Sequence, residues 1–141
     1  MTIIKEVEIS VQPVRVYRAL TTASELDSWF SQRTVVDVRP GGAYSNGDGD
    51  RGSFLEAVAP ERLRFTWDNP GHAPGTVVEI LLASTGAATT LTLIHSGFRN
   101  ERDADHYASR ESGWDWALEN LKAYLEGRPT TDYEPWLKTL G

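Results

Sequence analysis

Apolar and polar residues alternate at the start of the chain, which predicts a half-buried strand over residues 2–10. The odd positions from 5 to 9 share one side of this strand. Pro13 is a residue type favoured at the first position of a helix, and the apolar spacing after it becomes helical. A second short helix is predicted from Ser24, an N-cap residue type, to Phe30.

Six short strands are predicted between residues 33 and 97, because β-favouring runs there are separated by turn residues. The expected strands are 34–39, one that starts at Gly41 and Gly42 and includes Tyr44, 52–58, 62–68, 76–83 and 89–96. Residues 46–50 form a turn, since Asn-Gly and Asp-Gly supply the positive φ angles of tight hairpins. A loop is expected at 69–71, and the whole region is expected to form an antiparallel meander.

A helical stripe follows over 103–126, with apolar residues at positions 107, 114, 118, 121 and 125. Gly127 and Pro129 are typical of the end of such a helix. About 24 residues at about 1.5 Å each make it about 36 Å long, enough to cross a small sheet. Because the apolar face of the sheet needs a cover, we predict an α+β fold in which a curved antiparallel sheet wraps around this C-terminal helix. The predicted order is one strand, two helices, six strands and the long helix.

Several segments resemble, in their order and spacing, those of a known superfamily. They are residues 13–21, 26–30, 40–44, 52–56, 60–67, 95–98 and 113–114. The pattern resembles the SRPBCC superfamily, which includes START lipid-transfer domains and a major pollen allergen. Within it, the chain resembles the branch related to the C-terminal domain of the activator of the ninety-kilodalton heat-shock ATPase. The resemblance implies a helix-grip fold for one domain over 1–128, with 129–141 as a C-terminal tail.

Charge and composition argue against several classes of partner. The net charge is −6 and no cluster of Lys and Arg occurs, so nucleic acid is not expected as a partner. No apolar run approaches the roughly 20 residues that span a membrane, and the first residues lack the pattern of a signal peptide. We therefore expect a cytoplasmic protein without a membrane span. Cysteine is absent, which excludes disulfides and thiolate metal sites.

Asn46, Asp48 and Asp50 have the spacing of the first three ligands of an EF-hand calcium loop. Arg51 stands where that loop requires Gly and Ala57 where it requires Glu, so a hairpin turn is predicted instead. The three histidines show no metal-ligand spacing, and no glycine-rich phosphate loop occurs. We expect neither a metal nor a cofactor.

Aromatic residues are numerous for a chain of this length, with five Trp, five Tyr and four Phe. Ligand sites are lined mainly by aromatic and apolar side chains with a few polar anchors. The predicted ligand-binding residues are Trp29, Phe30, Tyr44, Phe54, Phe65, Trp67, Leu93, His95, Tyr107, Arg110 and Trp114. Ordinary core packing is the alternative interpretation for each of them alone, whereas the set together favours a cavity.

His95 and Arg110 are the polar members of this set. Alternation places His95 at the end of an inward-facing row, where a side chain that titrates near neutral pH can donate or accept a proton. A structural histidine bonded to the long helix is the alternative. Arg110 lies about 40° from the centre of the helical stripe, and its charge there must be paired or solvated. It could bind a ligand carboxylate through two hydrogen bonds, or pair with Glu111 or Glu56, or extend to the rim.

Three functions remain open from the sequence. The first is binding of a small hydrophobic or amphipathic molecule in a cavity between the sheet and the C-terminal helix. The second is a cyclase or hydrolase that uses His95, Arg110 and a tyrosine in the same cavity, so whether the protein is an enzyme stays undecided. The third, implied by the resemblance, is a co-chaperone-like module with a chaperone partner.

Trp116 lies about 160° from Trp114 around the long helix and would face away from the sheet. An exposed Trp there is unusual unless another segment covers it. The tail supplies apolar residues for this purpose, since a short helix capped by Asp132 would place Trp136, Leu137 and Leu140 on one side. We expect Trp116 to be covered by this tail or by a second copy in a homodimer.

Overall fold

A computed structural model describes residues 2–69, 75–99 and 104–140 of the chain. In this part of the chain seven strands and four helices follow one another in the order β1, α1, α2, β2 to β7, α3, α4. Their bounds are β1 Ile3–Ile9, α1 Pro13–Thr21, α2 Ala23–Trp29, β2 Val35–Val36, β3 Ala43–Ser45, β4 Arg51–Val58, β5 Arg62–Trp67, β6 Thr76–Thr85, β7 Ala88–Ser96, α3 Ala104–Leu125 and α4 Tyr133–Lys138. The predicted α+β class and element order are confirmed.

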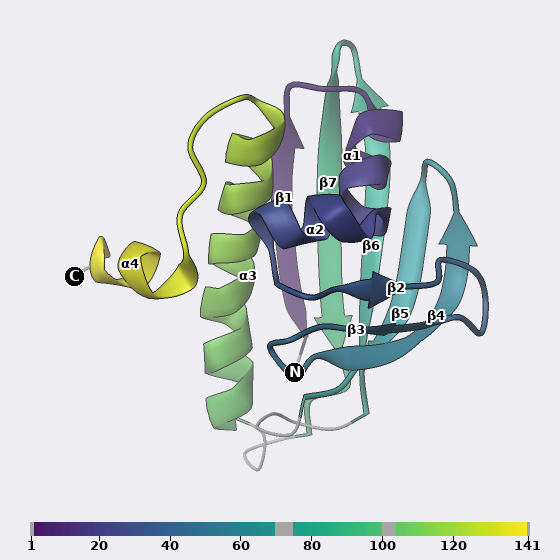
Figure 1. Ribbon diagram of the computed structural model, residues 1–141, viewed down its shortest axis with the longest axis vertical. Helices are drawn as coiled ribbons and strands as arrows, with labels where there is room; N and C mark the ends of the chain where they lie inside the picture. The colour runs from purple at the N-terminus through teal and green to yellow at the C-terminus, as the bar shows by residue number, and fades with distance from the viewer. Residues whose placement is uncertain (1, 70–74, 100–103, 141) are drawn as a thin grey trace.

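The strands form one antiparallel sheet with the order β1-β7-β6-β5-β4-β3-β2. The pairing of β4 with β5 shifts register between Phe54 and Glu56, and a bulge of this kind bends a sheet. In Figure 1, α1 and α2 lie across one face of the sheet and α3 runs beside β1. The long helix and the curved sheet therefore enclose a common core, as the sequence predicted.

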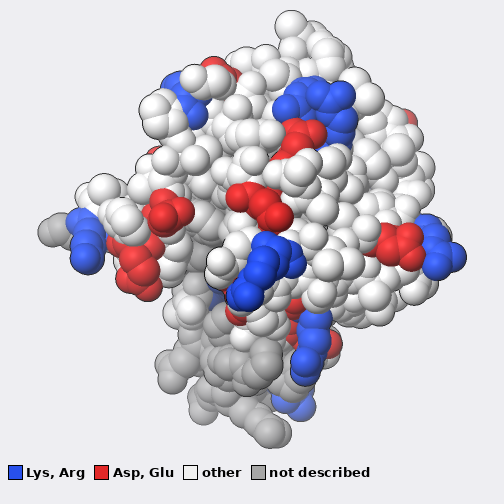
Figure 2. All heavy atoms as spheres, in the orientation of Figure 1, with Lys and Arg blue, Asp and Glu red and all other residues white. Residues whose placement is uncertain are grey.

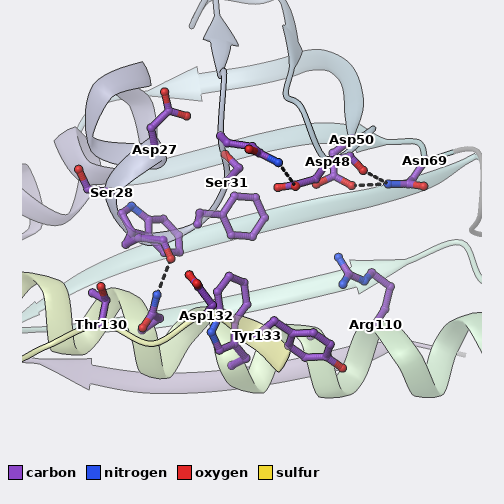
Figure 3. A pocket seen from close by; sticks show the side chains of 16 residues that line it. Asp27, Ser28, Ser31, Asp48, Asp50, Asn69, Arg110, Thr130, Asp132 and Tyr133 are labelled. Atoms are coloured by element: carbon purple, nitrogen blue, oxygen red, sulfur yellow. Dashed lines mark hydrogen bonds between the residues drawn. The ribbon is translucent and has the colours of Figure 1, made fainter. Parts of the chain in front are cut away.

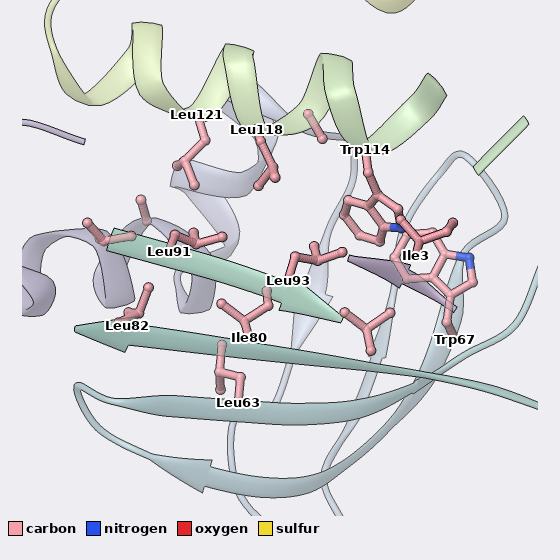
Figure 4. Packing of buried hydrophobic residues seen from close by; sticks show 14 of the residues in the cluster. Ile3, Leu63, Trp67, Ile80, Leu82, Leu91, Leu93, Trp114, Leu118 and Leu121 are labelled. Carbon is pink, nitrogen blue, oxygen red and sulfur yellow. The ribbon is translucent and has the colours of Figure 1, made fainter. Parts of the chain in front are cut away.

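The core side of the sheet follows from strict alternation along its central strands. Residues of β6 and β7 that face the core are buried, whereas the residues between them are partly exposed. Phe65 and Trp67 of β5 belong to the inward side, so the predicted orientation of this row is confirmed. On α3, Trp114, Leu118 and Leu121 point from the helix toward the strands (Figure 4).

The end of α3 shows why the helix stops where it does. Gly127 adopts a positive φ of 77°, a conformation that glycine tolerates best. The Arg128 N–H then donates to the Ala123 carbonyl at 2.8 Å, which closes the last turn in a Schellman arrangement. The predicted glycine cap is confirmed, and the chain is free to turn back along α3 as the tail.

Two predicted elements have different bounds in the structure. The helix α2 begins at Ala23 rather than behind a Ser24 cap, because the Thr22 carbonyl already accepts the N–H groups of Glu25 and Leu26. The strand expected at 34–39 is reduced to β2, because Thr34 bonds to the Asp27 carboxylate instead of a neighbouring strand.

Some sequence predictions concern residues that the structure does not describe. Part of the loop expected at 69–71 and His72 lie outside the described residues, as do the start of the predicted 103–126 helix and the side chain of His106. Among the described helices, none has both the length and the apolar character needed to cross a membrane.

Candidate functional site

Two hollows meet at the end of α2, where Trp29, Phe30 and Ser31 line both. The polar hollow measures about 540 Å³ and is lined by residues 27–32, Asp48, Asp50, Asn69, Arg110, Gly113, Trp116, Asn120, Thr130, Asp132 and Tyr133. The apolar hollow measures about 70 Å³ and is lined mainly by Leu20, Leu26, Trp29, Phe30, Tyr44, Phe54, Leu63, Phe65, Trp67, Ile80 and Trp114. The sequence predicted one cavity between sheet and helix, whereas the described part of the structure has two hollows there.

Aromatic rings form the boundary between the two hollows. The Phe30 ring stacks on Trp114 and on Trp116, with centroid separations of 6.1 and 6.2 Å, and meets the edge of Trp67 at 6.1 Å. Trp67 and Trp114 are themselves in edge contact at 5.1 Å. Because planar rings cannot adapt their shape, such a cluster gives rigid walls on both sides of Phe30.

Arg110 extends from α3 into the polar hollow (Figure 3). Its guanidinium carbon lies 5.3 Å from the Trp67 ring centre and 5.7 Å from that of Trp114, within cation–π distance of both. The Nε atom is buried without a hydrogen-bond partner, and Arg110 forms no ion pair with any described residue. Burial lowers the pKa of the guanidinium, and the charge of Asp50 opposes that shift.

The two carboxylates considered as partners of Arg110 are engaged elsewhere. Glu111 pairs with Lys5 and Glu56 pairs with Arg62, at 3.7 and 3.3 Å. The expected alternative of a salt bridge from Arg110 to Glu111 or Glu56 is therefore wrong.

Gly113 makes room for the Arg110 side chain. A Cβ atom at position 113 would lie 2.3 Å from the Arg110 Nη2 atom, closer than such contacts allow. Glycine in the middle of a helix costs up to about 1 kcal/mol relative to alanine. This glycine is therefore explained by the space that the guanidinium occupies.

His95 is fully buried and holds Trp114 in place. Its Nδ1 atom accepts a hydrogen bond of 2.9 Å from the Trp114 indole N–H. Since an indole nitrogen can only donate, Nδ1 carries no proton in this arrangement and the imidazole is neutral. This contact is the one expected for a structural histidine that is bonded to the long helix.

The rim of the polar hollow is acidic. Asp50 is only 7% exposed and accepts hydrogen bonds from the side-chain amides of Asn46 and Asn69, at 3.1 and 2.8 Å. Asn46 in turn accepts the backbone N–H groups of Asp48 and Asp50, which confirms the predicted turn. Asp48 accepts a hydrogen bond from the Gln32 side-chain amide. Figure 3 shows Asp48 and Asp50 next to Asn69. Over the face drawn in Figure 2, acidic and basic side chains are intermixed without a basic field.

The tail forms the outer wall of the polar hollow. The Trp116 indole N–H donates to the Thr131 carbonyl at 2.7 Å, and the Trp116 ring meets the edge of Tyr133. Of the two covers expected for Trp116, this chain's own tail is the one that the structure shows, and it leaves Trp116 half-buried. Trp136 is buried, whereas Leu137 and Leu140 are 39% and 64% exposed, so of these three apolar residues Trp136 alone is buried.

Asp132 occupies the N-cap position of α4, but its side chain makes no capping hydrogen bond. The predicted capping interaction is therefore wrong, although the position is right. Its carboxylate instead lines the polar hollow, where it adds a negative charge to the rim.

The family model described as Activator of Hsp90 ATPase homolog 1-like protein matches residues 10–126. The chain belongs to this family. CalU16 from Micromonospora echinospora is 26% identical over 88% of this chain and 75% of its own, with a TM-score of 0.76. DynU16, from the dynemicin biosynthetic locus, is 26% identical over 94% of this chain but 50% of its own, with a TM-score of 0.78.

A more distant structure supports the fold alone. The Aha1 dimer from Colwellia psychrerythraea is 22% identical over 89% of this chain and 96% of its own, with a TM-score of 0.78. No curated protein matches the chain. The helix-grip, SRPBCC-type fold implied by the sequence motifs is thus shown by both the family and its structural neighbours.

The predicted ligand-binding residues fall into three groups in the structure. Those that line the apolar hollow are Trp29, Phe30, Tyr44, Phe54, Phe65, Trp67 and Trp114. Arg110 lines the polar hollow, together with Trp29 and Phe30. Leu93 and His95 are sealed in the core, and Tyr107 packs on Phe98 and donates to the Thr2 carbonyl, so these three line neither hollow.

Sequence reasoning missed Gly113 and Asn120. Asn120 is buried, donates to the Trp29 carbonyl at 2.6 Å, and accepts the Thr131 N–H at 2.8 Å. It therefore joins the end of α2, the helix α3 and the tail. Glycine and asparagine are both weak helix formers, and here they lie inside a long helix. This was the available signal that the missing side chain of Gly113 and the side chain of Asn120 each serve a tertiary contact.

Proposed function

We propose that the protein binds a small amphipathic molecule where the two hollows meet. The observation that carries this proposal is the aromatic wall of Phe30, Trp67 and Trp114, with the unpaired charge of Arg110 laid across two of its rings. Protein interiors are usually close-packed and their charges paired. A rigid wall beside open volume, with one unused donor group, is the arrangement expected of a ligand site.

The volumes indicate how a ligand would divide between the hollows. Pockets for small molecules measure roughly 300–1,000 Å³, so the polar hollow of about 540 Å³ is large enough for the body of a ligand. The apolar hollow of about 70 Å³ holds only a small substituent. We therefore place the polar body of the ligand against Arg110 and an apolar end against Phe30.

Acid–base catalysis has less support. The Nδ1 atom of His95 is used by Trp114, and His95 lines neither hollow. The Tyr44 hydroxyl donates to the Thr66 carbonyl at 2.7 Å, and burial raises the pKa of this phenol. A cyclase or hydrolase would need at least two such groups within hydrogen-bond reach of one point in the hollow.

A chaperone-binding role, which the family description suggests, would need a continuous exposed surface. The large apolar side chains exposed in the described residues are spread over β1, α1, β2, β4 and the tail. Singly exposed apolar residues are normal on protein surfaces. This distribution favours the ligand-binding proposal over the chaperone alternative.

Binding can be tested with N-phenyl-1-naphthylamine, a neutral probe whose fluorescence rises in apolar surroundings. We expect saturable binding of one probe per chain, and a Phe30→Ala variant should bind about tenfold more weakly because a stacking wall is lost. Leu140→Ala is the matched control, because Leu140 is an exposed apolar residue outside both hollows. Unsaturable binding, or equal loss in both variants, would contradict the proposal.

A further inference from the structure

We propose that Arg110 anchors a ligand carrying a single carboxylate, which lies in the polar hollow against the Trp67 and Trp114 rings. This inference rests on the proposed function and names the chemical class of its ligand. The arginines that pair with a carboxylate are Arg15, Arg18, Arg39, Arg62 and Arg128. Arg110 is more buried than most of these, yet no described carboxylate pairs with it.

The chemistry of the guanidinium limits what can bind to it. It offers five N–H donors and no acceptor, so its partner must be an acceptor oxygen. Its planar fork matches the two oxygens of a carboxylate, and such paired, charge-assisted hydrogen bonds are stronger than neutral ones. A carboxylate is therefore the partner that would satisfy Arg110 most completely.

The guanidinium already lies against two aromatic rings in the absence of a ligand. The rings of Trp67 and Trp114 lie on one side, 5.3 and 5.7 Å from its central carbon, and the missing side chain of Gly113 leaves room beside it. A donor group that is already held in place loses less conformational freedom on binding. The arrangement thus favours recognition of a planar anionic group.

The acidic rim limits the charge that the ligand can carry. Asp48 and Asp50 already accept hydrogen bonds from Gln32 and Asn69, so neither needs a ligand. Their negative charges repel a second anionic group, because like charges across a poorly solvated hollow interact strongly. Asp27 and Asp132 add to this rim. We infer a monocarboxylate, with neutral or hydrogen-donating groups turned toward the aspartates.

Three probes that share the naphthyl group and differ in charge test this inference: 2-naphthoate, 2-naphthamide and 2-naphthylmethylammonium. The first is an anion, the second is neutral and the third is a cation. For the unmodified protein we expect affinity to fall in that order, with naphthoate binding about tenfold or more tightly than the cation. In the Arg110→Gln variant the order of the three affinities should reverse. The aspartates of the rim would then favour the cation over the anion. Arg128→Gln is the control, since Arg128 pairs with Glu126 and lines neither hollow.

Gly113→Ala provides a second variant that keeps the charge of Arg110. Its new methyl group would meet the Nη2 atom at 2.3 Å and displace the guanidinium, so naphthoate affinity should fall several-fold. Alanine has a higher helix propensity than glycine, so this substitution is not expected to weaken α3 itself. If Arg110→Gln fails to fold, Gly113→Ala decides the question.

The outcomes separate this inference from the proposed function. Equal binding of all three probes, unchanged in Arg110→Gln and Gly113→Ala, would overturn the carboxylate anchor and leave ligand binding intact. Tightest binding of the cation to the unmodified protein would show that the rim, and not Arg110, selects the charge. If no naphthyl probe and no N-phenyl-1-naphthylamine binds, both proposals are wrong.

Discussion

Along α3, the C-terminal half contacts the sheet through Leu118 and Leu121, whereas the N-terminal half does so through Trp114 and Arg110. Figure 4 shows the leucines turned toward Leu91 at one end of the core and Trp114 turned toward Trp67 at the other. We call these the aliphatic end and the aromatic end. Leu91 and Leu121 are fully buried and line neither hollow. Trp67 and Trp114, also buried, line the apolar hollow.

The difference shows how one core can serve two purposes. Branched aliphatic side chains fill irregular space, so the aliphatic end reaches the close packing that stabilises a fold. At the aromatic end, large rings leave volume between them, and the Trp67 indole nitrogen is buried without a hydrogen-bond partner. Buried polar groups are rarely left without a partner, so this indole nitrogen adds no protein hydrogen bond to the stability of the fold.

The largest expected effect compares one residue from each end. Leu91→Ala should lower the free energy of unfolding by about 4 kcal/mol, within the range for fully buried leucines. Trp67→Ala should cost about 3 kcal/mol, at the low end for large aromatic residues, because a hollow already lies beside it. Urea denaturation measures both. If Trp67→Ala costs clearly more than Leu91→Ala, the two ends are packed alike and the distinction is wrong.

A smaller effect is expected at Asn120, which lies between Leu118 and Leu121 on α3 and bonds to the Trp29 carbonyl. Asn120→Ala removes the partners of the Trp29 carbonyl and the Thr131 N–H, which should cost about 1–3 kcal/mol. It should also loosen the tail wall, and tryptophan fluorescence should change as Trp116 loses its cover. Asn120→Asp keeps the acceptor for Thr131 but removes the donor to Trp29. If both variants lose stability but tryptophan fluorescence does not change, the cover of Trp116 by the tail does not depend on Asn120.

The smallest effect concerns pH and the outer edge of the aliphatic end. Glu126 accepts hydrogen bonds from the Ser10 N–H, Arg128 and Lys122, which lower its pKa from about 4.5 to about 2. A carboxylate with a lowered pKa stabilises the fold above its unfolded-state pKa, and this contribution is lost as pH falls toward the folded value. We expect the difference in Tm between the unmodified protein and Glu126→Gln to be constant above about pH 5 and to vanish near pH 2. A difference that does not change over this interval would exclude the proposed bonds.

The fold was predictable because its main elements carry local periodicity. Alternation in 62–68 placed Trp67 inward, and the helical stripe placed Trp114, Leu118 and Leu121 toward the sheet. The errors arose at the boundaries of elements, where single hydrogen bonds decide which residue comes first. Ser24 is a good cap type, but the Thr22 carbonyl starts α2 first. Thr34 has a strand-forming side chain, but its bonds to Asp27 remove it from the sheet.

The site was predictable only on its apolar side. Rows of alternating residues brought the aromatic walls together, and helical phase placed Arg110 near the inward stripe. The polar hollow brings together Asp27, Asp50, Arg110 and Thr130, which come from four segments far apart in the chain. No periodic pattern relates such segments. Their meeting depends on tertiary contacts such as those of Asn120.

The edges of the sheet have a consequence for the behaviour of concentrated protein. Unpaired backbone groups along an edge strand can template pairing with another chain, which leads to aggregation. One edge, β2, is only two residues long, so it offers few such groups. At the other edge, α3 packs along β1 and Lys5 of that strand pairs with Asp115 at 2.9 Å. We therefore expect this sheet to resist extension by a neighbouring molecule at either edge.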